Sequence, residues 1–408
     1  MRCERVVSEK RVRKFIGWFA WGVVLCSSTA WADPDDGLSW VAGAGLMSND
    51  NLFLAPDGQK SSDVIRNETV GVKLDKGYSL QRFTIDATVT NYNYRNNSYL
   101  DYTGKNLNAG WAWSLSPRLY GNFTASRVDA LNSFIDFIPT TASQRRNIRT
   151  TQIDRLDAEW EMLGPWHLIG SGTRYSQHNS QTFIQDDSYW ARVGEAGVKY
   201  VSSAKNSVSL VRRWTSGNFA RAPDPTTEME SSFTQTDDEI RVLWQPTVKT
   251  SVNTRLAYIE RRSDQFAVRD YSGTVGSVDV NWSATDKLNL IASIRRDLNP
   301  FQNISSDTTS FSSYYASNMY TLTPTWAITE KTKLGLRYSV EQRDYRGTIV
   351  DGSPMRNDRL HYFGATAEWK PRKSVTVNLN YLHQTRDSNL PDLNFSANTL
   401  FLSALLNF

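Results

Sequence analysis

The last eleven residues, Asn398–Phe408, place the strongest constraint on the fold. Every second residue from Leu400 to Phe408 is apolar, and Thr399, Ser403 and Asn407 lie between them. Phe401 and Leu405 break the alternation. A period of two describes a strand with one apolar face. A strand that finishes on a C-terminal Phe is typical of bacterial outer-membrane barrels, whose assembly machinery recognises that residue. Phe408 is therefore the expected assembly signal, although a terminal strand of a soluble sandwich remains an alternative.

The N-terminus predicts export. Residues 1–14 are basic, residues 15–26 form an apolar run, and Ala30-Trp31-Ala32 follows as an A-x-A cleavage site. These are the three parts of a secretory signal peptide. The apolar run is too short for a membrane-spanning helix, which needs ~20 residues. Leu25 precedes Cys26 where a lipoprotein would need a small residue. We therefore expect a signal peptide over 1–32 and one outer-membrane β-barrel domain over 33–408.

Cleavage after Ala32 can be measured directly. The intact mass of the protein purified from outer membranes should correspond to a chain that starts at Asp33. A chain that retains Met1, or that carries lipid on Cys26, would contradict this expectation.

Composition excludes several function classes. Six of the 46 Lys and Arg and two of the 42 Asp and Glu precede residue 33, so the mature chain is nearly neutral and no nucleic-acid partner is expected. Both cysteines, Cys3 and Cys26, lie in the predicted signal peptide. The four histidines have no ligand spacing, so no metal or cofactor is expected. The mean hydropathy of −0.49 is compatible with a barrel, because only alternate residues would meet lipid.

Short turn signals recur about every 40 residues and divide the chain into hairpins. They lie at 75–77, 116–118, 164–165, 203–206, 245–246, 285–287, 329–331 and 370–372. Longer polar stretches alternate with them, near 48–63, 94–102, 131–149, 178–188, 216–232, 262–270, 299–311, 346–358 and 386–394. Eight short turns and nine long loops connect 18 strands. This asymmetry is typical of outer-membrane barrels, with short periplasmic turns, longer extracellular loops and both termini in the periplasm.

The segments beside the turns alternate with period two. After Asp286, for example, residues 288, 290, 292 and 294 are apolar and the intervening residues are polar. We expect the apolar parity to face lipid, with Leu290 and Leu336 near the bilayer midplane. Asn289 and Ser339 are then expected to face the lumen, where an arginine would cost much less.

Aromatic residues occur a few positions before most short turns. Such rings suit the lipid headgroup level, where one end can stay hydrated. The predicted membrane-interface girdle is Trp111, Trp113, Trp160, Trp244, Trp282, Trp326 and Trp369, with Tyr200 in the same position before its turn. A propeller also repeats near 40 residues, but it would need four short strands per repeat. Each repeat here holds about two strands of the length that spans a bilayer.

The parity opposite the apolar one is rich in charge. The candidate lumen-lining residues are Arg241, Arg255, Arg295, Arg337, Arg343, Glu239, Asp297 and Glu341, with Arg155, Arg192, Asp86, Asp157 and Glu159 as further members. An 18-strand barrel is wide enough for an aqueous channel unless loops plug it. Such charges could steer an anionic solute or polymer. Alternatively, they pair with one another and stiffen the wall.

An enzyme is not expected. Asp186-Asp187 and Asp237-Asp238 are adjacent pairs, which in a strand point to opposite faces. His178 and His361 lie near predicted loops and have plausible Ser or Asp neighbours, but these combinations do not exceed what chance would give. We therefore predict no catalytic residue.

Several segments resemble the EpsL family of outer-membrane proteins, which is associated with exosortase B and PEP-CTERM exopolysaccharide loci. These segments lie at 48–53, 75–83, 99–104, 144–148, 241–247, 264–266 and 270–273, in the family's order. The resemblance implies a β-barrel porin of a Gram-negative outer membrane that takes part in exopolysaccharide biosynthesis or export, working with periplasmic export components. It implies no catalytic residue, cofactor or residue-level polymer site.

Two function classes remain open. The first is a polysaccharide conduit, of which a general porin is a variant. The second is a non-conducting structural or adhesive barrel whose loops carry the interaction.

Overall fold

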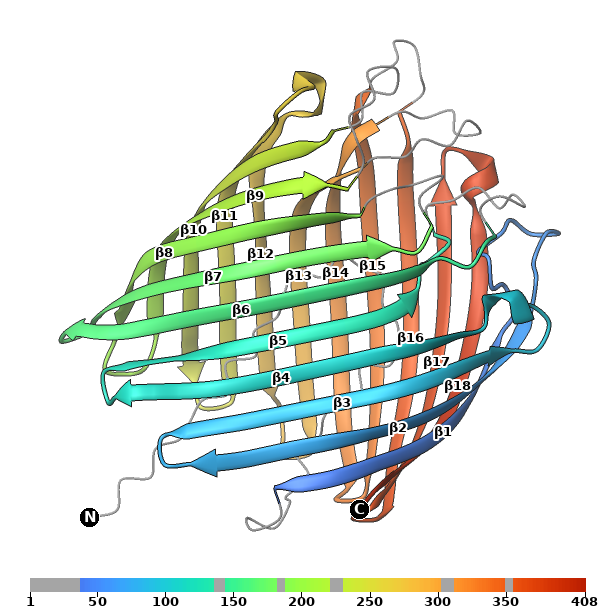
Figure 1. Ribbon diagram of the computed structural model, residues 1–408, viewed down its shortest axis with the longest axis horizontal. Coiled ribbons are helices and arrows are strands. Elements are labelled where there is room, and N and C mark those ends of the chain that lie inside the picture. The colour runs from blue at the N-terminus through green and yellow to red at the C-terminus, as the bar shows by residue number, and fades with distance from the viewer. Residues whose placement is uncertain (1–36, 136–143, 182–187, 221–229, 302–311, 349–354) are drawn as a thin grey trace.

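The computed structural model describes residues 37–135, 144–181, 188–220, 230–301, 312–348 and 355–408 (Figure 1). The predicted signal peptide lies outside these residues. Eighteen strands make up almost all of the described chain. They are β1 (Leu38–Asn49), β2 (Asp63–Tyr78), β3 (Gln81–Tyr94), β4 (Tyr102–Ser116), β5 (Leu119–Leu131), β6 (Ile148–Leu163), β7 (Trp166–Asn179), β8 (Tyr189–Val201), β9 (Ser207–Phe219), β10 (Ser232–Thr247), β11 (Thr250–Ser263), β12 (Tyr271–Ser283), β13 (Leu288–Pro300), β14 (Ser312–Thr329), β15 (Thr332–Thr348), β16 (Asn357–Arg372), β17 (Val375–Ser388) and β18 (Phe395–Asn407).

The described parts of the long loops contain three short 3-10 helices, η1 (Ser98–Leu100), η2 (Ala267–Arg269) and η3 (Pro391–Leu393). Among the described residues, no helix is long and apolar enough to cross a membrane.

The strands form one closed antiparallel barrel, which confirms the predicted fold class and strand number. Each strand pairs with the next in the chain, and β1 pairs with β18 from Val41↔Asn407 to Asn49↔Thr399. At the end of this seam, the backbone N–H of Trp40 donates to the carbonyl of Phe408 at 2.6 Å, and the return bond measures 3.0 Å. The terminal strand with its Phe408 therefore closes the barrel.

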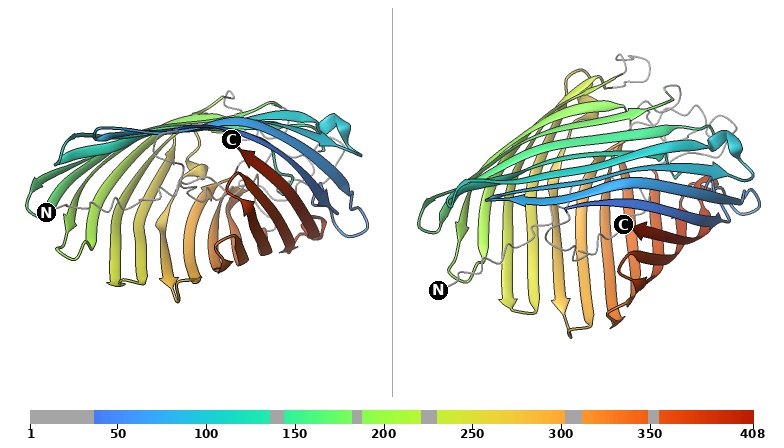
Figure 2. Two further views of the ribbon diagram at one scale, coloured as in Figure 1. Left: turned by 90° about the horizontal axis from the view of Figure 1, so that it is seen from below. Right: turned by 60° about the horizontal axis from the view of Figure 1, so that its bottom comes forward.

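The short turns lie at one end of the barrel and the long loops at the other. Figures 1 and 2 show the tilted strands, with the C-terminus at the short-turn end. In bacterial barrels the short turns face the periplasm and the long loops face outwards. The long-loop end is therefore assigned as extracellular below.

The pleat of each strand sorts its side chains between the two faces. On β15, Leu334, Leu336 and Tyr338 are exposed on the outside, whereas Ser339 and Glu341 are buried on the inside. The large exposed apolar residues follow the outward parity on almost every strand. An outward apolar face over a polar interior is the pattern of a membrane barrel.

The tryptophans of the predicted girdle lie on the outer face near the short-turn end. Trp111, Trp160, Trp244, Trp282, Trp326 and Trp369 are each between 38% and 53% exposed. Trp113 is half-buried and covers Gly121 of β5, where a Cβ would come within 2.6 Å of the indole. Trp40 and Trp166, which carry no turn signal just after them, extend the same belt.

Two of the expected depths need correction. Leu290 is in register with Trp282, and Leu336 lies only two residues beyond Leu334, which is in register with Trp326. Both therefore lie nearer the girdle than the midplane. Ser339 does face inward, but it is fully buried and hydrogen-bonded to Thr321 and Arg337, so an arginine there would be costly.

Two extracellular loops fold over the barrel interior. Leu54, from the β1–β2 loop, and Ile135, from the β5–β6 loop, pack against Leu360 and Tyr362 of β16 and Phe395 of β18. The Arg386 guanidinium of β17 donates to the carbonyl of Ile135 and to that of Leu393. These contacts join segments that are far apart around the barrel, so the loops narrow its extracellular end.

Candidate functional site: the charged lumen

The barrel encloses a cavity of about 1,280 Å³ that is lined from β5 to β14. Its lining includes the inward residues Arg155, Glu195, Arg241, Arg255 and Arg295. Hydrogen-bonding and charged side chains alternate there with small or apolar ones.

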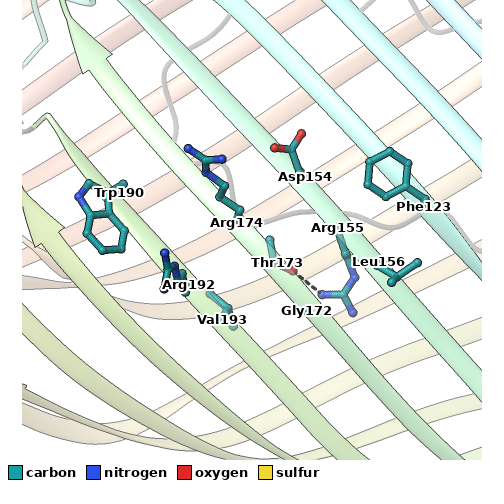
Figure 3. Close-up of a pocket in the computed structure, with 10 residues that line it drawn as sticks. All are labelled: Phe123, Asp154, Arg155, Leu156, Gly172, Thr173, Arg174, Trp190, Arg192 and Val193. Carbon is teal, nitrogen blue, oxygen red and sulfur yellow. Dashed lines mark hydrogen bonds between the residues drawn. The ribbon is translucent and has the colours of Figure 1, made fainter.

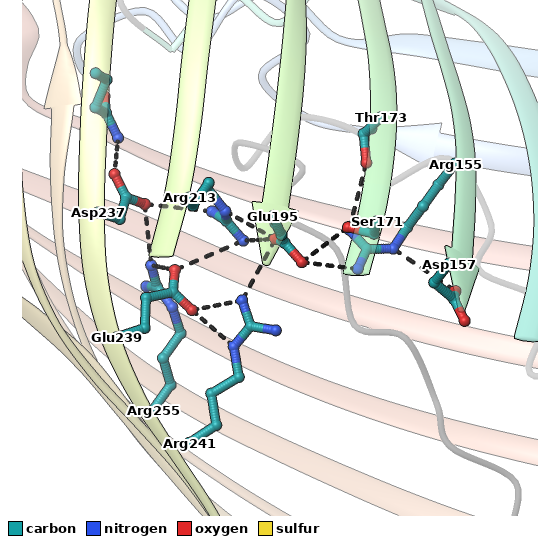
Figure 4. A network of polar contacts seen from close by, with 11 residues as sticks. Arg155, Asp157, Ser171, Thr173, Glu195, Arg213, Asp237, Glu239, Arg241 and Arg255 are labelled. Carbon is teal, nitrogen blue, oxygen red and sulfur yellow. Dashed lines mark hydrogen bonds and ion pairs between the residues drawn. The ribbon is translucent and has the colours of Figure 1, made fainter. Parts of the chain in front are cut away.

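A continuous polar network runs across one wall of this cavity, from β6 to β11 (Figure 4). Because side chains alternate between the two faces along each strand, every strand from β6 to β11 that contributes to the network places its polar side chains on the inner face. The register then aligns neighbours, because Asp237 pairs with Arg213 across β10 and β9, and Arg241 pairs with Arg255 across β10 and β11.

Glu195 of β8 is the centre of one half of the network. One carboxylate oxygen accepts from Arg155 Nη2 at 2.9 Å and from the Ser171 hydroxyl at 3.0 Å. The other oxygen lies 2.8 Å from Arg213 Nη2 and 3.3 Å from Arg241 Nη2. A single buried carboxylate therefore joins arginines from three strands.

Glu239 and Asp237 of β10 make up the other half. The fully buried Glu239 side chain accepts from Arg255 Nη2 at 2.5 Å and from Arg241 Nε at 2.7 Å. Asp237 lies 3.4 Å from Arg213 Nη1 and 3.3 Å from Arg255 Nη2. Arg213 thereby bridges the two halves.

The network is electrically balanced. Its four arginines are Arg155, Arg213, Arg241 and Arg255, and its four carboxylates are Asp157, Glu195, Asp237 and Glu239. Arg241 and Arg255, both predicted lumen residues, therefore belong to a paired wall. Only Arg241 keeps as much as 30% of its side chain exposed. This arrangement stiffens the wall. Because its charges cancel, the wall contributes little net electrostatic field to the lumen.

The remaining lumen candidates lie on β13 and β15. Arg295 is 35% exposed, with its nearest carboxylate, Asp297, at 4.0 Å. Arg337 Nε donates to the Ser339 hydroxyl at 3.2 Å. Arg343 and Glu341 form a buried pair at 2.8 Å, and Arg343 also stacks on Tyr315. Arg295 is thus only loosely paired with its carboxylate, whereas Arg343 is part of the wall packing.

A smaller cluster lies nearer the periplasmic end. Glu159 accepts from Lys199 Nζ at 2.7 Å and lies 2.9 Å from His167 Nδ1, and the Tyr120 hydroxyl donates to it at 3.1 Å. At the extracellular end, Glu230 lies 3.2 Å from Arg261, and burial raises the pKa of the Glu230 carboxyl. The first cluster links β6 to β8, and the second links the segment before β10 to β11.

One lumen prediction is wrong. Arg192 points to the outer face, because on β8 the inward parity is that of Ala191, Glu195 and Lys199. Glu195 and Arg213 also face the lumen, although neither is among the predicted lumen residues. Arg213 follows Arg212, which faces outwards. Because two adjacent positions both carry arginine, the sequence does not show which of them faces the lumen. Cross-strand alignment with Asp237 identifies Arg213 only once the register is known.

The adjacent carboxylates of β10 do not converge on one site. Asp237 is buried on the inner face, whereas Asp238 is exposed on the outer face, as expected for neighbours in a strand. Asp186 and Asp187 lie outside the described residues. Within the described ranges, no group of three or more His, Cys, Asp or Glu could hold a metal ion.

The class that this geometry defines is the outer-membrane β-barrel of the porin type. Residues 244–408 match a family model described as "Putative beta-barrel porin 2", which accounts for fewer than half of the residues. No curated protein matches the sequence.

Two solved structures are similar to this chain. OpdO of Pseudomonas aeruginosa has a TM-score of 0.50 at 13% identity, covering 91% of this chain and 97% of OpdO. OccK2 (OpdF) of the same organism, solved with glucuronate, has a TM-score of 0.49 at 10% identity, with 91% and 98% covered. At such low identity, the likeness to OpdO shows the fold alone.

Proposed function

We propose that this protein is an outer-membrane channel that passes an anionic saccharide polymer or its fragments. The observation that carries the proposal is the closed 18-strand barrel around a large cavity lined by charged and hydrogen-bonding side chains. A lumen of this kind can replace part of the hydration of a polar solute. The polysaccharide itself is suggested by the resemblance to the EpsL family and not by the geometry.

The charges of the lumen wall favour an anionic solute near Arg295 and Arg337. The β6–β11 wall is balanced, so it presents rigid hydrogen-bonding groups without a strong net field. Arg295 and Arg337 lie on a different wall, where Arg295 is 35% exposed and its carboxylate partner, Asp297, is 4.0 Å away. Guanidinium groups bind carboxylates and sulfates in bidentate geometry, so these two arginines are the expected contacts for acidic sugars.

A non-conducting barrel is the second candidate. The inward packing of Leu54 and Ile135, and the contact between Arg386 and Ile135, narrow the extracellular end. Single-channel conductance in planar bilayers separates the two cases, because a plugged barrel would show no steps. Polymer secretion by a deletion strain separates polysaccharide export from general uptake. Normal secretion together with impaired uptake of small solutes would favour the general porin.

Ion selectivity tests the role of the two arginines. Replacing Arg295 and Arg337 with Glu changes the lumen charge by four units and leaves the lipid face untouched. We expect the ratio of chloride to potassium permeability to fall by at least about twofold, measured from reversal potentials in a salt gradient.

The matched control is Arg296→Glu, on the same strand as Arg295 but on the outer face, where it bonds to Asn318. That variant should leave the reversal potential unchanged. If the double variant assembles and conducts with the selectivity of the parent, the two arginines do not line the permeation path.

A further inference from the structure

The outer face of the barrel carries two arginines where the fold calls for apolar residues. Arg174 of β7 and Arg192 of β8 are cross-strand partners and both point outwards (Figure 3). Asp154 of β6 is the partner of Arg174 in the same row. Among the described residues, neither guanidinium has a carboxylate within 4.0 Å. The Arg192 guanidinium instead lies 5.4 Å from the centre of the Trp190 ring.

A groove lies directly beside this pair, one row nearer the periplasm. Its floor is formed by Gly172 and Gly194, which are also cross-strand partners. A Cβ at either glycine would meet nothing within 4 Å, so the space above both is open. The resulting cavity measures about 640 Å³ and is flanked by Phe123, Leu156 and Trp190. The groove is therefore apolar along its length and cationic at its extracellular end.

Depth places the arginines in the outer leaflet, within the extracellular part of the apolar band. Arg174 is eight residues from Trp166, the girdle residue at the start of β7, and five residues from the end of the strand. With a rise of ~3.3 Å per residue and a tilt of ~45°, eight residues climb about 19 Å. The apolar band of such barrels is ~25 Å tall, so the backbone at Arg174 lies about 6 Å below the outer edge of the band, a distance that a long arginine side chain can span. The exposed Trp190, two residues nearer the loops than Arg192, is a typical marker of the interface.

Charge argues for an anionic occupant. Two guanidiniums face one carboxylate in this row, so the site has an unmatched positive charge close to a low-dielectric layer. A charge so placed is costly unless a counter-charge or water reaches it. Phosphate is well suited, because adjacent arginines can bind its oxygens through charge-assisted hydrogen bonds.

We propose that this groove binds a phosphorylated glycolipid of the outer leaflet, of the lipid A class. Arg174 and Arg192 hold a phosphate, and one acyl chain lies over Gly172 and Gly194 between Leu156 and the aromatic rings. The extracellular depth of the arginines selects the outer leaflet, where this glycolipid is the abundant phosphate-bearing lipid. The site lies on the opposite side of the wall from the lumen and is independent of conduction.

Native mass spectrometry of the detergent-purified protein tests the proposal with added bisphosphorylated lipid A. We expect one retained lipid A per barrel and weaker retention of phosphatidylglycerol. The double variant Arg174→Ala/Arg192→Ala should bind lipid A at least about tenfold more weakly, because it loses charge-assisted contacts. Gly194→Leu, which keeps both arginines but fills the groove, should also weaken binding. A heat-modifiability shift on gels verifies that each variant is folded.

The control is Arg262→Ala, which removes another outward arginine, one already paired with Glu260. It should bind lipid A as the parent does. Undiminished binding in both groove variants overturns the proposal, as does equal affinity for phosphatidylglycerol. A change from oligomer to monomer in the groove variants, with lipid A binding unchanged, would instead show that the groove is a contact between two copies of the chain.

Discussion

Replacing Glu239 with Gln should lower the free energy of unfolding of the barrel by about 3 kcal/mol, because removing one member of a buried ion pair leaves its partners uncompensated. The Glu239 side chain is fully buried, and it lies within 3.7 Å of Arg213, Arg241 and Arg255. Gln keeps the shape and removes the charge, so the loss reports the electrostatic role. Reversible urea unfolding into lipid vesicles provides the measurement.

The control for that experiment is the neighbouring residue. Asp238 pairs with Arg212 at 3.5 Å on the outer face, but both side chains are more than half exposed. Exposed ion pairs are worth ~0–1 kcal/mol. Asp238→Asn should therefore change stability by less than about 1 kcal/mol. Equal losses in the two variants would show that the inner network is as well solvated as the outer pair.

An arginine in place of Leu256 should destabilise the barrel by about 2–4 kcal/mol, the cost of that side chain at the bilayer midplane. Leu256 is 51% exposed on the outer face of β11 and lies four residues beyond Val252, the register partner of the girdle residue Trp244. Lipid cannot solvate the guanidinium at that depth. The same urea unfolding assay measures the effect.

Asn253→Arg is the matched variant on the same strand. Asn253 faces the lumen and lines the cavity, where water can hydrate a guanidinium. Its cost should stay below about 1 kcal/mol. If Asn253→Arg costs as much as Leu256→Arg, the assignment of the two faces of β11 is wrong.

The cost of an arginine should also depend on depth at Leu290 and Leu336, the two positions expected from the sequence to lie at the midplane. Leu290 and Leu336 lie close to the tryptophan belt, so arginine there should cost less than at Leu256. Counting residues from a turn cannot give depth, because the tilt and register of neighbouring strands decide how far each row rises above the interface.

The sequence by itself determined the architecture of this protein. Alternation of period two, turn signals about 40 residues apart and tryptophans before the turns are local patterns, and each is dictated by the pleat, by backbone dihedrals or by the headgroup layer. Together they predicted a closed antiparallel barrel of 18 strands, and the structure confirms it. The inward parity of Arg241, Arg255, Arg295 and Arg337 was likewise readable from their apolar neighbours.

Where the alternation of apolar and polar residues is weak, the sequence does not show which side chains face the lumen. On β8 the outward row contains Arg192, Gly194 and Ala196, and the inward row contains Val193, Glu195 and Gly197. Neither parity is clearly the apolar one, so Arg192 was assigned to the lumen. The structure places it on the outer face beside Arg174, where it forms part of the proposed lipid site.

Only the tertiary structure decided which charges neutralise one another. Arg155 and Arg241 are 86 positions apart in the chain, yet both contact Glu195 because β6 to β10 lie side by side. The inward packing of Ile135 against β16–β18 likewise joins remote segments. Pairing of side chains depends on register and on the curvature of the wall, which arise from all 18 strands closing together, and no local pattern in the chain encodes it.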